Sequence, residues 1–243
     1  TQTPPSPILS GLVGSEMCIR DSSGNVSVQG KVGGGIGDIY GTIWSKDANG
    51  NHLVNASGRP IASNPDQLLG NAQPDWMGGL SNTMTYGNWN VNFLIDGRFG
   101  GAIFSEEAAY FDQMGISQNS LLYRETGTTL VGLDPSGAAN TQSMTGQEYW
   151  GSNSAIAENH VYKQDNIRLR EFSVGYNVPG ISSMGIESAN VRLIGRNLFY
   201  FDKSAPDGID PEAMLGTNIQ GQGISAGSLP TTTSIGLNLT LKF

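Results

Sequence analysis

The last ten residues of the chain alternate between apolar and polar side chains without interruption. Isoleucine, leucine and phenylalanine occupy every second position from Ile235 to Phe243, and the positions between them carry Gly, Asn, Thr and Lys. A repeat of two residues is the period of a β-strand, because successive side chains of a strand point to opposite faces. We therefore expect a final strand with one face in apolar surroundings and the other face in water.

Other segments show the same repeat. Residues 79–86 and 89–99 both alternate, and the two-residue turn Gly87-Asn88 between them predicts a β-hairpin over 79–99. Segments 168–178 and 191–201 are also predicted strands, and the second ends in Phe199, Tyr200 and Phe201. Several of these strands are about 11 residues long, which is the length a tilted strand needs to cross a bilayer, whereas most strands of soluble proteins have about 5–6 residues.

The composition favours strands and turns over helices. The chain has 243 residues with 34 glycines, and only 14% of its residues are charged. No run of 18 or more apolar residues is present, so a transmembrane helix is excluded. A membrane barrel is not excluded, because its strands alternate in polarity. The predicted fold class is therefore all-β, as part of a transmembrane antiparallel β-barrel with long extracellular loops.

The charged residues, cysteine and histidines exclude several other classes of function. The net charge is −8 and Lys and Arg form no cluster, which argues against nucleic acid as a partner. The single cysteine, Cys18, excludes a disulfide framework and a CxxC metal site. His52 and His160 are each isolated among loop-type residues, which favours solvated side chains. We predict no catalytic, cofactor or metal site, and no enzyme.

The connections between the strands alternate in length. Gly87-Asn88 and 179–190 are short, whereas 100–166 and 202–232 are long and rich in Gly, Asn and Ser. Outer-membrane barrels have short periplasmic turns and long external loops, so a periplasmic C-terminus would place both long connections outside. We expect an external excursion over 23–78 with a hairpin that turns at 46–51 between 39–45 and 52–55. A short helix is expected over 104–111, with Ser105 as its N-cap.

The N-terminal residues 1–22 lack this periodicity and also lack the features of a secretory signal. They resemble translated read-through from a sequencing adapter, so we interpret 1–22 as a non-native leader and 23–243 as one barrel segment. A disordered natural leader is the alternative.

Ordered motifs carry a resemblance to a known family. The segment 68–101 resembles the SusC/RagA pattern of a Gly-Asn-x-x-Pro turn before a Gly-Gly-Leu strand, and 167–179 is similar to its Leu-Arg strand that ends in Gly-Tyr-x-x-Pro, with Val174 at a leucine position. The segment 191–201 contains Asn-Leu-Phe, 209–213 contains Asp-Pro-Glu, and Pro230 precedes the Phe-terminated strand. The chain is thus similar to the C-terminal barrel part of SusC/RagA-type TonB-dependent receptors.

This resemblance implies a piece of an importer of large nutrients, either glycans or peptides, in the outer membrane of Gram-negative bacteria such as Bacteroidota. Such importers have a plugged barrel of about 22 strands. The implied partners are the lipid bilayer, a SusD-like surface lipoprotein, TonB–ExbB–ExbD acting through an upstream region, and the barrel-assembly machinery. Leu239, Leu241 and Phe243 would form the C-terminal signal for that machinery.

Several residues suggest other chemistry, and a plainer interpretation is preferred for each. Residues 47–51 resemble part of a calcium loop but lack the terminal Glu, so a turn is preferred. Glu106-Glu107 and the Asp210/Glu212 pair are preferred as solvated loop charges over acid–base pairs. The glycine-rich 33–37 lacks the Lys-Ser/Thr of a phosphate loop. Five loop aromatics could stack on a substrate or pack the loop: Tyr110, Phe111, Tyr123, Tyr149 and Trp150.

Two other functions stay open at this point. A passive porin would share the strands but would have no plug upstream. A soluble β-sandwich binding module would cover the apolar strand faces with a second sheet. The environment of Leu237, Leu239 and Leu241 separates a membrane barrel from a sandwich.

Overall fold

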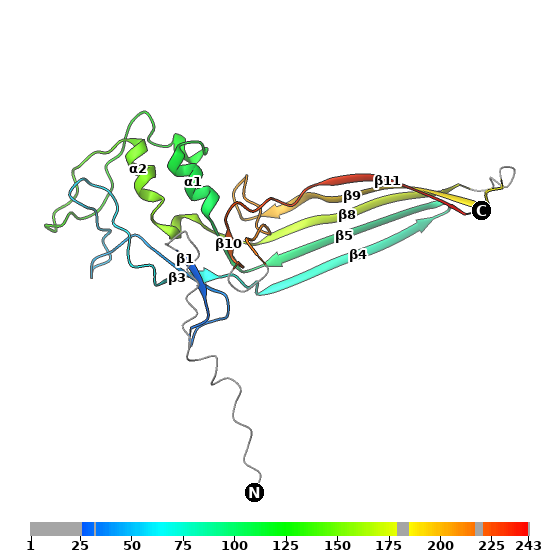
Figure 1. Cartoon of the computed structure of the whole chain (residues 1–243), viewed down its shortest axis with the longest axis horizontal. Coiled ribbons are helices and arrows are strands. Elements are labelled where there is room, and N and C mark those ends of the chain that lie inside the picture. Colours follow the sequence, from blue (N-terminus) through cyan, green and yellow to red (C-terminus); the bar gives the residue numbers. More distant parts are fainter. Residues whose placement is uncertain (1–25, 32, 179–184, 217–220, 243) are drawn as a thin grey trace, which may run out of the picture. The chain divides into compact units, whose positions relative to one another are not determined.

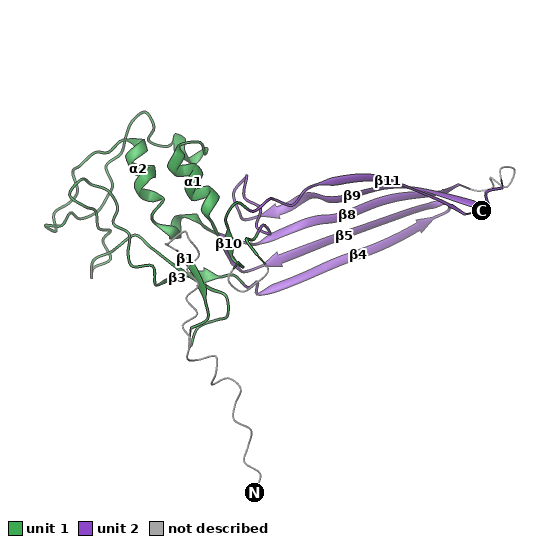
Figure 2. Cartoon of the chain, in the orientation of Figure 1, with its two compact units in different colours: residues 1–72, 104–161, 214–227 green, residues 73–103, 162–213, 228–243 purple. Residues whose placement is uncertain are grey.

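The computed structural model describes residues 26–31, 33–178, 185–216 and 221–242. Within it the chain forms two compact units (Figures 1 and 2). Unit 1 comprises residues 1–72, 104–161 and 214–227, and unit 2 comprises residues 73–103, 162–213 and 228–243. The predicted leader, 1–22, lies outside the described residues.

Unit 2 is built on a five-stranded antiparallel sheet in the order β11-β9-β8-β5-β4 (Figure 1). Its strands, in chain order, are β4 (Trp76–Tyr86), β5 (Trp89–Phe99), β8 (Asn166–Val178), β9 (Ser188–Lys203) and β11 (Ser234–Lys242). Each strand pairs with the next one along the chain. This agrees with the predicted antiparallel arrangement of long strands.

The predicted hairpin over 79–99 is confirmed. Tyr86 pairs with Trp89, and Gly87 has a φ of +56°, a conformation that glycine adopts without strain. The pairing of β8 with β9 has bulge-type register shifts between Ile167 and Arg168 and again between Leu169 and Glu171, and β9 is longer than predicted at 16 residues. Such bulges re-aim side chains near the end of a sheet.

Unit 1 combines short strands with short helices. Strands β1 (Val26–Gln29), β2 (Asp38–Gly41) and β3 (Gln67–Asn71) form one antiparallel sheet. The helices are α1 (Glu106–Met114) and α2 (Gly146–Asn153), with 3-10 turns η2 (Asn119–Leu121) and η3 (Ala157–His160). Strand β10 (Ile224–Ser225) runs parallel to the end of β6 (Ala102–Ser105), and β7 (Val161–Lys163) follows η3. The chain passes from one unit to the other within β6 and within β7.

A small apolar core holds unit 1 together. Ile39, Val54 and Ile156 are fully buried although they come from segments far apart in the sequence. Gly223 approaches this core so closely that a Cβ there would lie 2.6 Å from the Cβ of Ala72, and its φ of +75° also disfavours a larger residue. Unit 1 thus has an apolar core of its own.

Three local predictions need correction. The helix begins at Glu106 instead of residue 104, because Phe104 belongs to β6, and it continues to Met114. Ser105 is the N-cap of this helix, as predicted, and its side chain accepts a hydrogen bond from the Ala108 amide. The turn at 46–51 exists, with Lys46 bridged to His52, but residues 39–41 pair with β1 and β3 and not with 52–55. Helix α2 was not predicted.

None of the helices in the described part of the chain has the length and apolar character needed to span a membrane.

Candidate functional site

One face of the five-stranded sheet is apolar across its whole width. Residues that pair across antiparallel strands share a face, so the register identifies complete rows of side chains. One such row runs from β4 to β11 and consists of Met84, Val91, Val174, Leu193 and Leu237. The row nearer the hairpin turn consists of Tyr86, Trp89, Tyr176, Val191 and Leu239.

This apolar face is not covered by any other described part of the chain. Leu237, Leu239 and Leu241 are 73%, 59% and 40% exposed. A soluble sandwich would bury them under a second sheet. Exposed apolar patches larger than a few hundred Å² are rare on soluble proteins and indicate contact with a membrane or a protein. The geometry is therefore that of a sheet whose apolar face meets another apolar medium.

Aromatic side chains gather at both ends of these strands. Trp89 packs against Tyr176 near the hairpin turn, with ring centroids 4.8 Å apart. At the opposite end Trp76 lies against Phe99, with centroids 5.6 Å apart, and Phe199 contacts Phe201. Tryptophan and tyrosine favour the two interfaces of a bilayer. Two aromatic groups, one at each end of long strands, fit a transmembrane sheet.

The other face of the sheet is largely polar. One row consists of Thr83, Asn92, Ser173, Ile194 and Gly236, with Ile194 as its apolar member. Asn92 Nδ2 donates to Ser173 Oγ at 3.3 Å. Nearer the turn, Asn190 donates to Asn177 at 2.7 Å. Leu94 is an exception, as the sequence indicated, and its cross-strand neighbour is Glu171. This face suits an aqueous lumen.

A cluster of charged residues occupies the end of the polar face away from the hairpin turn. Arg170 donates to Asp96 from Nε at 2.8 Å, and its Nη1 and Nη2 hold both carboxylate oxygens of Glu212 at 2.9 and 2.7 Å. Arg168, only 3% exposed, donates to the same carboxylate at 3.2 Å. Glu212 thus serves as the counter-charge of two arginines.

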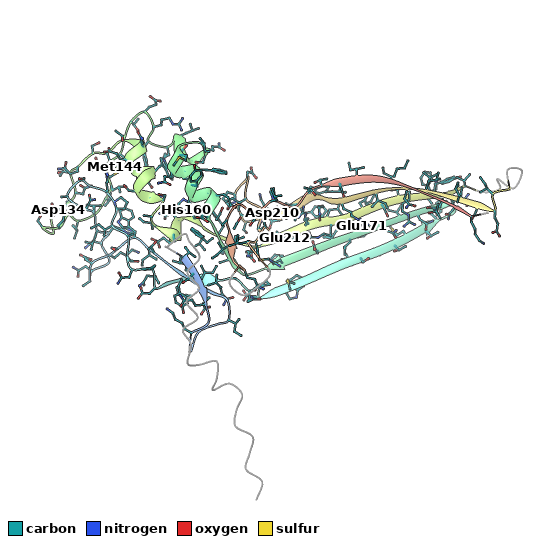
Figure 3. All side chains as sticks on the ribbon, in the orientation of Figure 1. Asp134, Met144, His160, Glu171, Asp210 and Glu212 are labelled. Atoms are coloured by element: carbon teal, nitrogen blue, oxygen red, sulfur yellow. The ribbon has the colours of Figure 1, made fainter. Side chains whose placement is uncertain are left out.

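Asp210, which is labelled with Glu212 in Figure 3, also binds this segment to the sheet. It accepts hydrogen bonds from Tyr200 Oη at 2.8 Å and from the amide and hydroxyl of Thr231. Burial alone would raise the pKa of the Asp210 carboxyl, but these hydrogen bonds and the Glu212 amide favour the charged form and hold the pKa below its ordinary value. The segment that contains Asp210 and Glu212 is therefore fixed to the sheet.

The interpretation of Asp210 and Glu212 as solvated loop charges is thus wrong. The side chain of Glu212 is 16% exposed and every partner named above lies within unit 2. The sequence contained the signal, since Asp-Pro-Glu and the Leu-Arg strand both belong to the family pattern. The contact between Arg170 and Glu212 could not be predicted, because the two residues are 42 positions apart.

The loop aromatics lie in unit 1 and mainly pack against one another. Tyr149 contacts both Tyr123 and Trp150 edge-on, with ring centroids 5.1 and 4.9 Å apart. Trp150 is buried, and its indole N–H donates to the Leu122 carbonyl at 3.1 Å. Tyr110 and Phe111 on α1 are 53% and 45% exposed. The structure therefore brings three of the five together and leaves two on the surface.

His160 is buried in unit 1, which corrects the prediction of a solvated loop histidine. Its Nε2 lies 3.1 Å from Asp112 Oδ2, and the two side chains are 1% and 4% exposed. Burial lowers the pKa of the His160 imidazole, although Asp112 partly opposes that shift. Asp112 also accepts a hydrogen bond from Ser117 Oγ. The pair joins α1 to η3.

A hollow opens between the end of α1 and the start of α2, within unit 1. Its volume is about 510 Å³, within the range of small-molecule sites. Its lining comprises Asp112, Gln113, Met114, Gly115, Ser120, Arg124, Thr145, Gly146, Gln147 and Trp150. Sequence reasoning did not predict this hollow, since its walls come from three separate segments.

The other residues singled out in the sequence form local structure. Asp47 accepts hydrogen bonds from the amides of Asn49 and Asn51, so its carboxylate closes a turn, and no group of residues that could hold a metal ion occurs in the described chain. Glu107 accepts from Ser105 and Ser225. In the glycine-rich segment, the Gly35 amide donates to Asp38, so that amide does not face a phosphate. Residue Phe243 lies outside the described residues, whereas Leu239 and Leu241 lie on the exposed apolar face.

Comparisons with known proteins agree with this geometry. TonB-dependent receptor P3 of Formosa agariphila is 24% identical over 220 residues, covering 86% of this chain and 20% of the receptor. TonB-dependent receptor P26 of the same organism is 28% identical over 216 residues, covering 83% of this chain and 20% of the receptor. The predicted resemblance to TonB-dependent receptors is confirmed. The chain spans about a fifth of the length of these receptors.

Two solved structures of similar fold support this resemblance. The RagAB peptide importer in its closed-closed state matches with a TM-score of 0.52 at 16% identity, covering 85% of this chain and 21% of that chain. A second structure of the RagAB peptide transporter matches with a TM-score of 0.52 at 15% identity, covering 86% and 24%. No family model matches the sequence.

Proposed function

We propose that the chain forms part of the wall of a TonB-dependent importer in the outer membrane of a Gram-negative bacterium of the Bacteroidota. The complete barrel would have about 22 strands, of which β4, β5, β8, β9 and β11 are consecutive members. The observation that carries the proposal is the exposed apolar face of these strands, with aromatic groups at both ends.

The polar face of the sheet would line the lumen, and unit 1 would consist of external loops. The cargo would be a large polar nutrient, either a glycan or a peptide. The relatives are named receptors and the matched structures belong to a peptide importer, which supports import over catalysis.

A SusD-like surface lipoprotein would act as the partner of unit 1. Large apolar side chains are exposed on α1 and on the turns that follow it, which is typical of a surface that contacts another protein. These residues are Tyr110, Phe111, Met114, Ile116, Leu121 and Leu122.

Energy for import would come from TonB–ExbB–ExbD through a region upstream of this chain. The barrel-assembly machinery would recognise the last strand through Leu239, Leu241 and Phe243. Both roles follow from the family resemblance.

The proposal is tested on the whole protein that contains this chain. Expressed in a Gram-negative host, it should fractionate with the outer membrane. It should also migrate faster on detergent gels without heating than after boiling, because a closed barrel stays folded in the detergent. A product that remains in the soluble fraction without detergent, or that migrates identically with and without boiling, would contradict the proposal.

A further inference from the structure

We propose that the hollow in unit 1 binds the C-terminal carboxylate of a peptide through Arg124. This inference rests on the proposed import function and specifies one chemical feature of the cargo.

The guanidinium of Arg124 is held in place at this hollow. Its Nη2 donates both to the Gly115 carbonyl at 2.5 Å and to Ser120 Oγ at 3.2 Å. These contacts occupy only Nη2, so Nη1 and Nε keep donors for another acceptor. A guanidinium that is already oriented loses less conformational freedom when a ligand binds.

Arg124 also has no carboxylate within ion-pair distance among the described residues. The other described arginine of unit 1, Arg59, pairs with Glu148 at 2.8 Å. In a chain with 21 acidic and 13 basic residues, an exposed arginine that lines a hollow and lacks such a partner is a candidate for binding an external anion.

The carboxylates near the hollow already have partners. Asp112 is hydrogen-bonded to Ser117 and His160, and Glu148 accepts from Thr145 and Arg59. A ligand carboxylate therefore would not have to displace either of these groups from Arg124.

The backbone around Arg124 is unusual and brings α2 close to it. Tyr123 has a φ of +64°, which is rare for a residue other than glycine. At Gly146 a Cβ would lie only 2.7 Å from the Tyr123 carbonyl oxygen, so this close approach requires glycine. The beginning of α2, with Gln147, consequently forms one wall of the hollow.

The rest of the lining fits a peptide better than a sugar. Gln113 and Gln147 are exposed side-chain amides, which can both donate to and accept from peptide groups. Trp150, the aromatic residue of the lining, is only 8% exposed, and its N–H is already bonded to Leu122. It therefore offers little ring surface on which a sugar could stack.

The test measures binding to the whole importer purified in detergent. Two equimolar libraries of random octapeptides with blocked N-termini, one with free C-terminal carboxylates and one amidated, are mixed with the protein, and retained peptides are quantified by mass spectrometry. We expect the carboxylate library to be retained about tenfold more than the amidated library, because a charge-assisted bond to arginine is lost on amidation.

Two variants and one control sharpen the test. Arg124→Gln should reduce retention of the carboxylate library to the level of the amidated one, and Gln147→Trp should do the same by filling the hollow. Lys46→Gln removes a positive charge from a turn of unit 1 that does not line the hollow, and it should leave retention unchanged.

Equal retention of the two libraries, or unchanged preference in the Arg124→Gln and Gln147→Trp variants, would overturn the inference. So would Arg124-dependent retention of uronic-acid oligosaccharides in a parallel arm without retention of peptides. Gel migration tests the barrel separately, so the site and the proposed function can fail independently.

Discussion

The two units of this chain bury their apolar residues to different extents. In unit 1, Ile39, Val54 and Ile156 are fully buried. In unit 2, Ile235 and Leu237 are 72% and 73% exposed, although both lie in a regular strand. Because apolar surface is driven out of water wherever it can be, the difference supports the proposed function, in which water surrounds unit 1 and hydrocarbon lies along one face of unit 2.

The strands of the two units also differ in length. Strands β1 and β2 have 4 residues each, whereas β4 and β5 have 11 residues each. Short strands suffice when they pack on a small core. Long alternating strands are needed when a bilayer about 30 Å thick must be crossed. Four substitutions test whether this contrast holds, from the largest expected effect to the smallest.

The largest effect is expected in the core of unit 1. Ile156→Ala should destabilise unit 1 by about 4 kcal/mol, because it removes buried methyl groups and leaves a cavity. Hydrogen exchange of the amides of α1 and α2 would measure the loss. The matched change Ile116→Ala, at a residue that is 67% exposed, should cost less than about 0.5 kcal/mol. Equal effects would mean that unit 1 has no core of its own.

A charge on the apolar face of unit 2 should cost somewhat less. Leu239→Arg should destabilise the barrel in lipid by about 3 kcal/mol, since an arginine would have to enter hydrocarbon. Urea titration of the protein refolded into vesicles would measure this. Asn238→Arg, on the adjacent polar face, is the control and should change stability little. A larger loss for Asn238→Arg would reverse the assignment of the two faces.

The cluster of charged residues around Glu212 provides a third test, on the polar face. Glu212→Ala should lower the free energy of unfolding by about 2 kcal/mol, because it leaves the buried Arg168 without a carboxylate partner. The loss stays moderate because Arg170, the other partner of Glu212, is partly exposed to water. Proteolysis of the 204–216 segment should also become faster. Glu187→Ala removes the exposed pair with Lys242, whose side chains are 63% and 69% exposed, and should have almost no effect.

The smallest effect that we expect is a dependence of the stability of unit 1 on pH. Burial lowers the pKa of His160, so the unfolded chain binds a proton at a higher pH than the folded unit does. Unit 1 should therefore lose stability as the pH falls below the ordinary histidine value of about 6.5. Hydrogen exchange of α1 measured against pH would reveal it. In the His160→Gln variant, this loss of stability at low pH should disappear. If the variant and the original protein showed the same dependence of stability on pH, other groups would be responsible for it.

The sequence predicted the sheet of unit 2 better than any feature of unit 1. The two-residue repeat and the Gly87-Asn88 turn identified the strands because those signals are local. The cluster at Glu212 depends on contacts between distant segments, which periodicity does not encode. Helix α2 was missed although Thr145 and Glu148 form a capping box, a signal visible in the sequence. The buried position of His160 could not be predicted, since its partner Asp112 lies 48 residues away.

The most direct test of the account is the environment of alternate residues in β11. In a Cys18→Ser background, single cysteines at Leu237, Leu239 and Leu241 would be compared with cysteines at Asn238 and Thr240 in the protein reconstituted into vesicles. Spin labels on the three leucine positions should be accessible to oxygen dissolved in the bilayer, and those on the two polar positions to a water-soluble nickel complex. Equal access of the nickel complex to all five positions, or labels immobilised within a protein core at the leucine positions, would contradict the account.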